Sequence, residues 1–196
     1  MFLRSLATWL FSVCSSCAVV CAQDGIFEVW KGDDRVGHIT VGRTIAGNRT
    51  SYWMTSISSF EIIWKQNVRS ITATEYVNDQ VTACYSSMHV NDAVRDSSRM
   101  LTVGDRALCF VHPTSYFEGN ATNPWTTARM YYEEPTGQPS IFVESALHDC
   151  PLQRMAEGEY QLTLPNKKRN YYIYRKGVLH EIRIERTWFD LVFKRV

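Results

Sequence analysis

From residue 25 onward, short runs rich in valine, isoleucine, threonine and aromatic residues alternate with pairs of glycine, asparagine and aspartate. Branched and aromatic side chains favour strands because they pack well on a pleated, half-buried surface. The pattern predicts twelve strands, at residues 25–31, 35–45, 49–60, 68–77, 80–90, 93–103, 106–112, 140–146, 159–164, 170–175, 178–185 and 189–195.

The residues between these runs are typical of tight hairpins. Gly47-Asn48, Asn78-Asp79, Asn91-Asp92 and Gly104-Asp105 each separate two consecutive runs. Such residues tolerate a positive φ or bond to their own backbone, as a two-residue turn requires. A turn after almost every strand indicates that consecutive strands pair, which predicts an antiparallel up-and-down meander.

The segment 115–134 breaks this rhythm. Asn120, Asn123 and Pro124 interrupt any strand there. Thr122 or Asn123 is suited to cap a helix whose first turn contains the proline. We therefore expect one short helix at residues 124–132.

Alternation of polar and apolar positions is imperfect in several strands. Residues 171–174 read Tyr-Tyr-Ile-Tyr, and residues 52–54 read Tyr-Trp-Met, so aromatic side chains occupy both faces. A sheet with one solvated face shows cleaner alternation. The fold class predicted is mainly β: a curved half-barrel or open barrel of about twelve strands with one short helix. A two-sheet sandwich with a packed core is equally compatible with this pattern.

The first 22 residues have the pattern of a signal peptide. Arg4 precedes an uncharged, mostly apolar run at residues 5–20, which is shorter than the roughly 20 residues of a stable membrane span. Val20 and Ala22 supply small residues before a cleavage site between Ala22 and Gln23. We expect a signal peptide at 1–22, a single β domain at 23–196 with no membrane span, and an exported protein, periplasmic or extracellular.

The charge balance argues against nucleic acid as a partner. The formal net charge is +1, and it falls to 0 without residues 1–22, where Arg4 is the only charged residue. A neutral domain is a poor binder of nucleic acids and of anionic membranes.

Three cysteines follow the expected signal peptide: Cys84, Cys109 and Cys150. Cys84 and Cys109 fall on next-but-one strands, about 10 Å apart, whereas a disulfide needs Cα atoms within about 7 Å. Cys109 with Cys150 is the better candidate for a bridge. Isolated, partly buried thiols are an equally open alternative.

Catalytic and cofactor motifs are lacking in the sequence. It contains no nucleophile elbow, phosphate-binding glycine loop, dinucleotide fingerprint or metalloprotease helix motif, and its five histidines are scattered singly. We therefore predict no cofactor, no metal and no catalytic residues. The adjacent Glu133 and Glu134 would point to opposite faces of a strand, so a structural salt bridge, with a partner such as Arg129, is the expected role. The basic cluster Lys167-Lys168-Arg169 is expected to be solvated surface charge.

Several segments resemble one family of bacterial proteins. TARMYYEEPTGQPSIFVES, GEYQLTLPNKKRNYYIYRKGVLHEIRIE, FDLVFKRV and, near the start, IFEVWKGDDRVGHITV are similar to an uncharacterised exported family, domain of unknown function 6134. The resemblance spans residues 23–196 and is strongest over 129–196; Asn166-Lys167-Lys168 and the three cysteines depart from it. It implies fold and location but no activity. By fold analogy alone, such proteins are similar to half-barrel envelope proteins, which include lipoprotein carriers.

The leading hypothesis is a non-enzymatic β half-barrel that binds an apolar small molecule or a lipid. The segment 123–132 would plug or flap over its concave side. The expected ligand-lining residues are aromatic or soft apolar side chains, whose alternative role is ordinary core packing: Trp53, Trp64, Tyr85, Trp125, Met130, Tyr172 and Tyr174.

Two other functions stay open. One is a structural or interaction protein of the cell envelope that pairs an edge strand with another protein. The other is an enzyme with a dispersed site, in which His148, Glu133 and Tyr131 would meet in a cleft.

Overall fold

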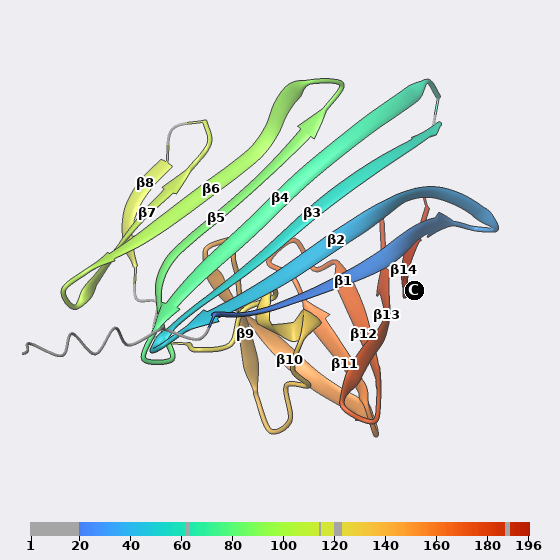
Figure 1. Ribbon diagram of the computed structural model, residues 1–196. Coiled ribbons are helices and arrows are strands. Elements are labelled where there is room, and N and C mark those ends of the chain that lie inside the picture. Colours follow the sequence, from blue (N-terminus) through green and yellow to red (C-terminus); the bar gives the residue numbers. More distant parts are fainter. Residues whose placement is uncertain (1–19, 62, 114, 120–122, 187–188) are drawn as a thin grey trace, which may run out of the picture.

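A computed structural model describes residues 20–61, 63–113, 115–119, 123–186 and 189–196. Its regular structure is almost entirely β (Figure 1). The described strands are β1 (Val20–Lys31), β2 (Asp34–Ala46), β3 (Arg49–Glu61), β4 (Lys65–Val77), β5 (Gln80–Val90), β6 (Ala93–Val103), β7 (Arg106–Val111), β8 (Ser115–Gly119), β9 (Ser140–Val143), β10 (His148–Ala156), β11 (Glu159–Thr163), β12 (Arg169–Arg175), β13 (Val178–Ile184) and β14 (Leu191–Arg195).

All fourteen strands belong to one antiparallel sheet in the order β8-β7-β6-β5-β4-β3-β2-β1-β14-β13-β12-β11-β10-β9. Strand β1 joins the two halves, because it pairs with β2 on one side and with β14 on the other. The sheet does not close, since β8 and β9 stand at its two ends. The predicted meander and open, curved architecture are therefore confirmed.

Left-handed backbone conformations at the hairpin tips explain why these turns form. Asn78, Asp79, Asn91 and Asp92 have φ values of 52°, 60°, 49° and 66°. Asparagine and aspartate adopt this region more readily than other non-glycine residues. These residues form the turns between β4 and β5 and between β5 and β6, at the positions that the sequence predicts.

Two strands and one helix differ from the sequence prediction. The sequence does not predict strands β8 and β10, because neither has a regular alternation of polar and apolar residues. Although it contains Pro151, β10 pairs with both β9 and β11. The expected helix at 124–132 shrinks to a single 3-10 turn, η1 (Arg129–Tyr131). Ahead of it the backbone is extended, because Phe142 N–H donates to Trp125 O (2.8 Å) and Thr127 N–H to Phe142 O (3.3 Å).

Strand β1 begins inside the segment that the sequence assigns to a signal peptide. Val20, Cys21 and Ala22 pair with Ala46, Ile45 and Thr44 of β2. Residues 1–19 lie outside the described residues, so the cleavage site after Ala22 remains a prediction.

The crossing segment, residues 123–139, runs between the two ends of the sheet and packs inside it. Figure 1 shows it enclosed between the long strands β1–β6 and the shorter strands β9–β13. Met130 and Tyr131 belong to a core with β1, β2 and β9–β14, whereas Ala128 packs in a second core with β3–β7. The crossing segment therefore fills part of the concave interior as a plug.

Cys84, Cys109 and Cys150 are free and buried. Cys84 and Cys109 both pair with Met100, one on each side, which places them on next-but-one strands. Cys150 packs in the other core, so the expected Cys109–Cys150 bridge is wrong. Burial raises the pKa of the Cys150 thiol to about 11.

No helix in the described ranges has the length and apolar character needed to cross a membrane.

Candidate functional site

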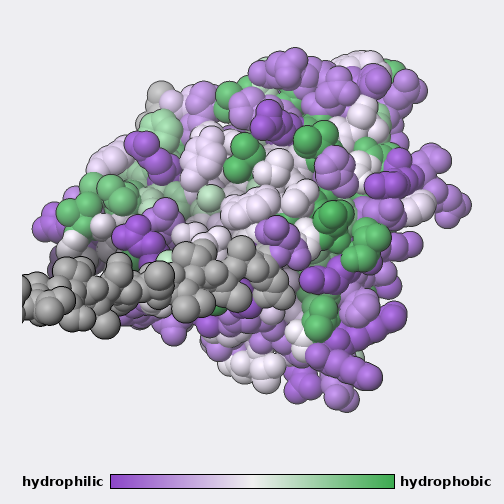
Figure 2. Space-filling view, viewed as in Figure 1, coloured by the Kyte–Doolittle hydropathy of each residue, from purple (hydrophilic) through white to green (hydrophobic). Residues whose placement is uncertain are grey.

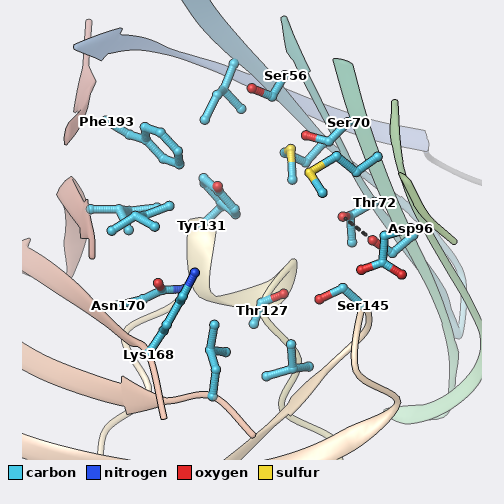
Figure 3. A pocket seen from close by; sticks show the side chains of 18 of the residues that line it. Ser56, Ser70, Thr72, Asp96, Thr127, Tyr131, Ser145, Lys168, Asn170 and Phe193 are labelled. Atoms are coloured by element: carbon cyan, nitrogen blue, oxygen red, sulfur yellow. Dashed lines mark hydrogen bonds between the residues drawn. The ribbon is translucent and has the colours of Figure 1, made fainter. Parts of the chain in front are cut away.

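A cavity of about 420 Å³ lies in the concave interior, next to the crossing segment (Figure 3). One of its walls is a row of side chains that the sheet register places side by side on β2–β6. The row reads Ile39, Ser56, Ser70, Met88 and Asp96, each paired with the next. The volume of the cavity falls within the range of roughly 300–1,000 Å³ that is typical of small-molecule sites.

The second wall comes from the other half of the sheet. Tyr172, Ile182 and Phe193 form a register row across β12, β13 and β14, and Asn170 pairs with Ile184 beside it. These strands reach the first wall only because β1 joins β2 to β14. Thr127 and Tyr131 of the crossing segment project between the walls (Figure 3).

The two walls differ in chemistry. The β3–β5 side is rich in hydroxyl groups from Ser56, Ser70, Thr72 and Ser86, and Thr72 and Ser86 lie 3.4 Å apart, within hydrogen-bond distance. The β13–β14 side is apolar. An occupant that fits both walls has an apolar part and a part that forms hydrogen bonds.

Lys168 enters the cavity from the turn between β11 and β12. The turn is closed by hydrogen bonds from Leu164 N–H to Lys168 O (2.8 Å) and from Lys168 N–H to Asn166 Oδ1 (3.1 Å), with Lys167 at φ 65°. Lys167 is exposed, whereas Lys168 is half-buried and lines the cavity. Lys168 is therefore less exposed than Lys167, although both stand in the same basic turn.

Several polar groups around the cavity lack partners. Asn170 Oδ1 is buried and has no hydrogen-bond partner, whereas Ser87 Oγ, the other such atom among the described residues, lies on the outer face with Ile71 and Tyr85. The side chains of Lys168, Arg186 and Asp96 form no ion pair with any described residue. Burial normally requires a polar atom such as Asn170 Oδ1 to be satisfied, so its position beside the half-buried, unpaired Lys168 points to a binding site; Arg186 is exposed.

The floor beside the cavity is held by Glu144, which is 0% exposed. Its Oε1 accepts hydrogen bonds from Thr74 Oγ1 (2.9 Å) and Ala128 N–H (3.0 Å), and its Oε2 accepts from Thr127 N–H (3.3 Å) and Thr127 Oγ1. Its own carbonyl oxygen accepts from Ser98 Oγ (2.7 Å). The Glu144 carboxylate therefore ties the crossing segment to β4, and its carbonyl oxygen is bound to β6.

A second polar network anchors the same segment farther along. Arg129 pairs with Glu133 at 2.8 Å, as the sequence predicts, and Glu133 Oε1 accepts from the Tyr52 hydroxyl (3.0 Å) and from Arg43 (3.4 Å). Burial and the neighbouring Glu133 carboxylate raise the pKa of Tyr52 to about 12. The role of Glu133 in the structure is to position the crossing segment.

The seven expected ligand-lining residues do not lie together: one lines the cavity, three pack in or against the core, and three lie away from the cavity. Tyr172 lines the cavity, where burial raises the pKa of its hydroxyl. Met130 and Tyr174 lie in the core, and the Tyr174 hydroxyl donates to Met130 O (2.6 Å). Trp125 is half-buried under the Arg129 guanidinium, 4.6 Å from the ring centroid.

The remaining three lie away from the cavity. Trp53 is 38% exposed and covers Gly42, where a Cβ would come within 2.0 Å of the indole. Tyr85 lies on the same outer face, because Ala73 pairs with both residues. Trp64, 65% exposed, follows β3. For all seven residues, contact with a ligand stays a prediction.

The outer face has exposed apolar side chains and carries Ser87 Oγ, one of the two buried polar atoms without a partner among the described residues. Tyr85, Leu101 and Phe110 line a hollow there. In Figure 2 the hydrophobic residues on the visible side form separate groups, divided by polar ones. Scattered apolar residues of this kind are ordinary on protein surfaces.

The dispersed enzyme site is not assembled in this structure. His148 is exposed on β10, Tyr131 packs edge-on against Phe27, and Glu133 is bound to Arg129 and Tyr52. No hydrogen bond joins these three residues to one another within the described ranges. Groups of three or more metal-ligating side chains are likewise absent from that part of the chain.

Lys168, Asn170 and the hydroxyl row escape notice in the sequence. Lys168 stands in a basic turn that resembles any solvated hairpin tip, and serine and threonine alternate with apolar residues in many surface strands. One usable indication was the Ser/Thr content of β3–β5, which is unusual for the inner face of a sheet.

Comparison with known proteins supplies a family and a fold. The family model described as "Domain of unknown function (DUF6134)" matches residues 27–196. No curated protein matches the chain. Among solved structures, the chain is similar to a beta-barrel-like protein of domain of unknown function DUF1849 from Brucella abortus, with 10% identity and a TM-score of 0.53, covering 91% of this chain and 97% of that one. At this identity the likeness shows the fold alone.

Proposed function

Because the chain belongs to the DUF6134 family, whose description names no activity, we propose its function from the cavity: a non-enzymatic protein that binds an apolar, lipid-like molecule between the two halves of its sheet. The observation that supports this most is the concave cavity itself. Its apolar wall faces a hydroxyl-bearing wall, and the buried Asn170 Oδ1 beside the apolar wall has no hydrogen-bond partner. If the protein's own side chains filled this space, there would be no open cavity and no unpartnered polar atom beside it.

Export remains part of this proposal. The apolar first 22 residues with Arg4 at their start support it, and cleavage after Ala22 leaves residues 23–31 of β1 in place. A binding protein outside the cytoplasm would meet lipids and other apolar molecules released from membranes.

A pair of adjacent substitutions tests the binding proposal. Ser56 lines the cavity, and Thr55 precedes it on the same strand with its side chain on the opposite face. The purified, delipidated chain is titrated with the neutral fluorescent dye N-phenyl-1-naphthylamine. We expect Ser56→Phe to weaken dye binding about tenfold or more and Thr55→Phe to leave it unchanged.

Circular dichroism of both variants controls for folding. Native mass spectrometry of protein purified from its own host provides the second readout, in which a stoichiometric apolar adduct is expected. A wild-type chain that binds neither dye nor lipid, with a clean mass and no effect of Ser56→Phe, would falsify the proposal.

An interaction function has one specific observation in its favour. Strand β8 stands at the end of the sheet with no described strand on its outer side, and Tyr116 on it is 64% exposed. The opposite end is covered, because Thr126 bridges to Phe142 of β9. An open edge can pair with a strand of another protein. Concentration-dependent sedimentation, with and without Phe117→Pro to block pairing along β8, tests this second candidate.

A further inference from the structure

Lys168 is a charged group that projects into the cavity. In Figure 3 its side chain reaches up between Asn170 and Tyr131. It is half-buried and forms no ion pair with any residue of the described chain. The neighbouring Lys167, on the same turn, is exposed, so the turn itself does not force a lysine inward.

An ammonium group in this position is costly without a counter-charge. Removing a cation from water is unfavourable unless an anion or several hydrogen-bond acceptors compensate for the lost hydration. The described residues around Lys168 offer no carboxylate. A negatively charged ligand group would supply the compensation.

Arg186 strengthens the positive character of the same wall. It follows β13 and lines the cavity with Ile184 and Asn170, which pair with each other. Its Nη1 donates to Glu185 O (3.0 Å), and the group has no carboxylate partner in the described residues. Arg186 is an exposed residue, so it adds a solvent-accessible positive charge to this wall.

The single carboxylate on the cavity wall lies on the other side. Asp96 belongs to β6 and stands beside Thr72 and Ser145, opposite Lys168 (Figure 3). It repels an anion from the hydroxyl-bearing wall. The electrostatic arrangement therefore orients an anionic head group toward β12 and β13.

Asn170 adds a requirement for a hydrogen-bond donor. Its Oδ1 is buried without a partner next to Lys168. A hydroxyl or N–H group on the ligand, close to its anionic group, would donate a hydrogen bond to this buried oxygen.

We propose, on the basis of the binding function above, that the ligand is an anionic amphiphile whose carboxylate or phosphate head is held by Lys168 and Arg186. Its apolar part then lies against Phe193, Ile39 and Ile182. Charge-assisted hydrogen bonds of this kind contribute more to affinity than neutral ones, which gives selectivity for the charged head.

Three ligands with the same chain test this proposal: dodecanol, dodecanoate and dodecyl phosphate, each displacing N-phenyl-1-naphthylamine from the delipidated chain. We expect one or both anions to bind about tenfold more tightly than dodecanol, and the better anion identifies the head group. Lys168→Gln should reduce that preference to about twofold or less, and Lys167→Gln should retain it. Thermal unfolding checks that both variants fold.

The outcomes separate this proposal from the binding function. If dodecanol binds as tightly as both anions, or if Lys167→Gln and Lys168→Gln reduce the preference equally, the anionic head group is refuted while binding of an apolar chain stands. If none of the three ligands nor the dye binds the wild-type chain, both proposals are overturned together.

Discussion

Two ionisable residues of the interior, Glu144 beside the cavity and Lys168 on its wall, have opposite surroundings. Four hydrogen bonds from Thr74, Thr127 and Ala128 reach the Glu144 carboxylate. Lys168 has no ion pair with a described residue. A buried charge whose partners are all supplied by the fold stabilises the fold, whereas one left without partners is available to a ligand.

Glu133 is the intermediate case. Its side chain is 31% exposed, and it is paired with Arg129 and accepts from Tyr52. Like Glu144 it fixes the crossing segment, but it does so at a half-solvated position where each interaction is weaker. The three groups together form a series from fully satisfied to unsatisfied.

The largest effect is expected from removing the fully satisfied charge. Glu144→Ala leaves the donors of Thr74, Thr127 and Ala128 buried without an acceptor, and it should lower the free energy of unfolding by about 3 kcal/mol or more. Urea unfolding followed by circular dichroism measures this. The exposed Glu157→Ala is the control, expected within about 0.5 kcal/mol of wild type. Equal stability of the two variants would mean that the hydrogen bonds to Glu144 contribute nothing.

Alkaline pH is expected to weaken the stabilisation that Tyr52 provides through its hydrogen bond to Glu133. The pKa of Tyr52 is raised from 10.0 to about 12, so the folded state holds this proton more tightly than the unfolded state. The stabilisation is complete below pH 10 and is lost as the pH rises from 10 to 12. Burial raises the pKa of other tyrosines in the same direction, among them Tyr76 and Tyr131.

The contribution of Tyr52 is isolated by comparing wild type with Tyr52→Phe. Stability is measured by urea unfolding at pH 8, 10, 11 and 12. We expect the variant to be less stable at pH 8, because Glu133 loses a donor, and the difference to narrow above pH 10. A difference that stays constant across this range would contradict the assigned coupling between Tyr52 and Glu133.

The smallest effect on stability is expected at the unsatisfied charge. Lys168→Met replaces a half-buried cation by an apolar side chain of similar length, so the free energy of unfolding should stay unchanged or rise by up to about 1 kcal/mol. Chemical unfolding without added ligand measures it. A loss of more than about 1 kcal/mol would show that Lys168 stabilises the fold itself, and the contrast with Glu144 would fail.

The sequence by itself determined the local structure of this protein. Strand-forming runs separated by Asn-Asp and Gly-containing turns specify hairpins between neighbours, because positive φ values are available to these residues and the pairing is local. The meander of neighbouring hairpins and the Arg129–Glu133 pair, four residues apart, follow from information within short stretches of chain. The same holds for the plug segment, which asparagine and proline keep out of the strands.

Only the tertiary structure decided where the two halves of the sheet meet. The pairing of β1 with β14 joins residues far apart in the sequence, and it brings Lys168 and Asn170 opposite Ser70 and Asp96. It also decides which face of a strand is concave, which places Trp53 outside and Met54 inside although they are adjacent. Whether a lysine in a turn is solvated or buried depends on what lies across from it, and that is a property of the folded chain alone.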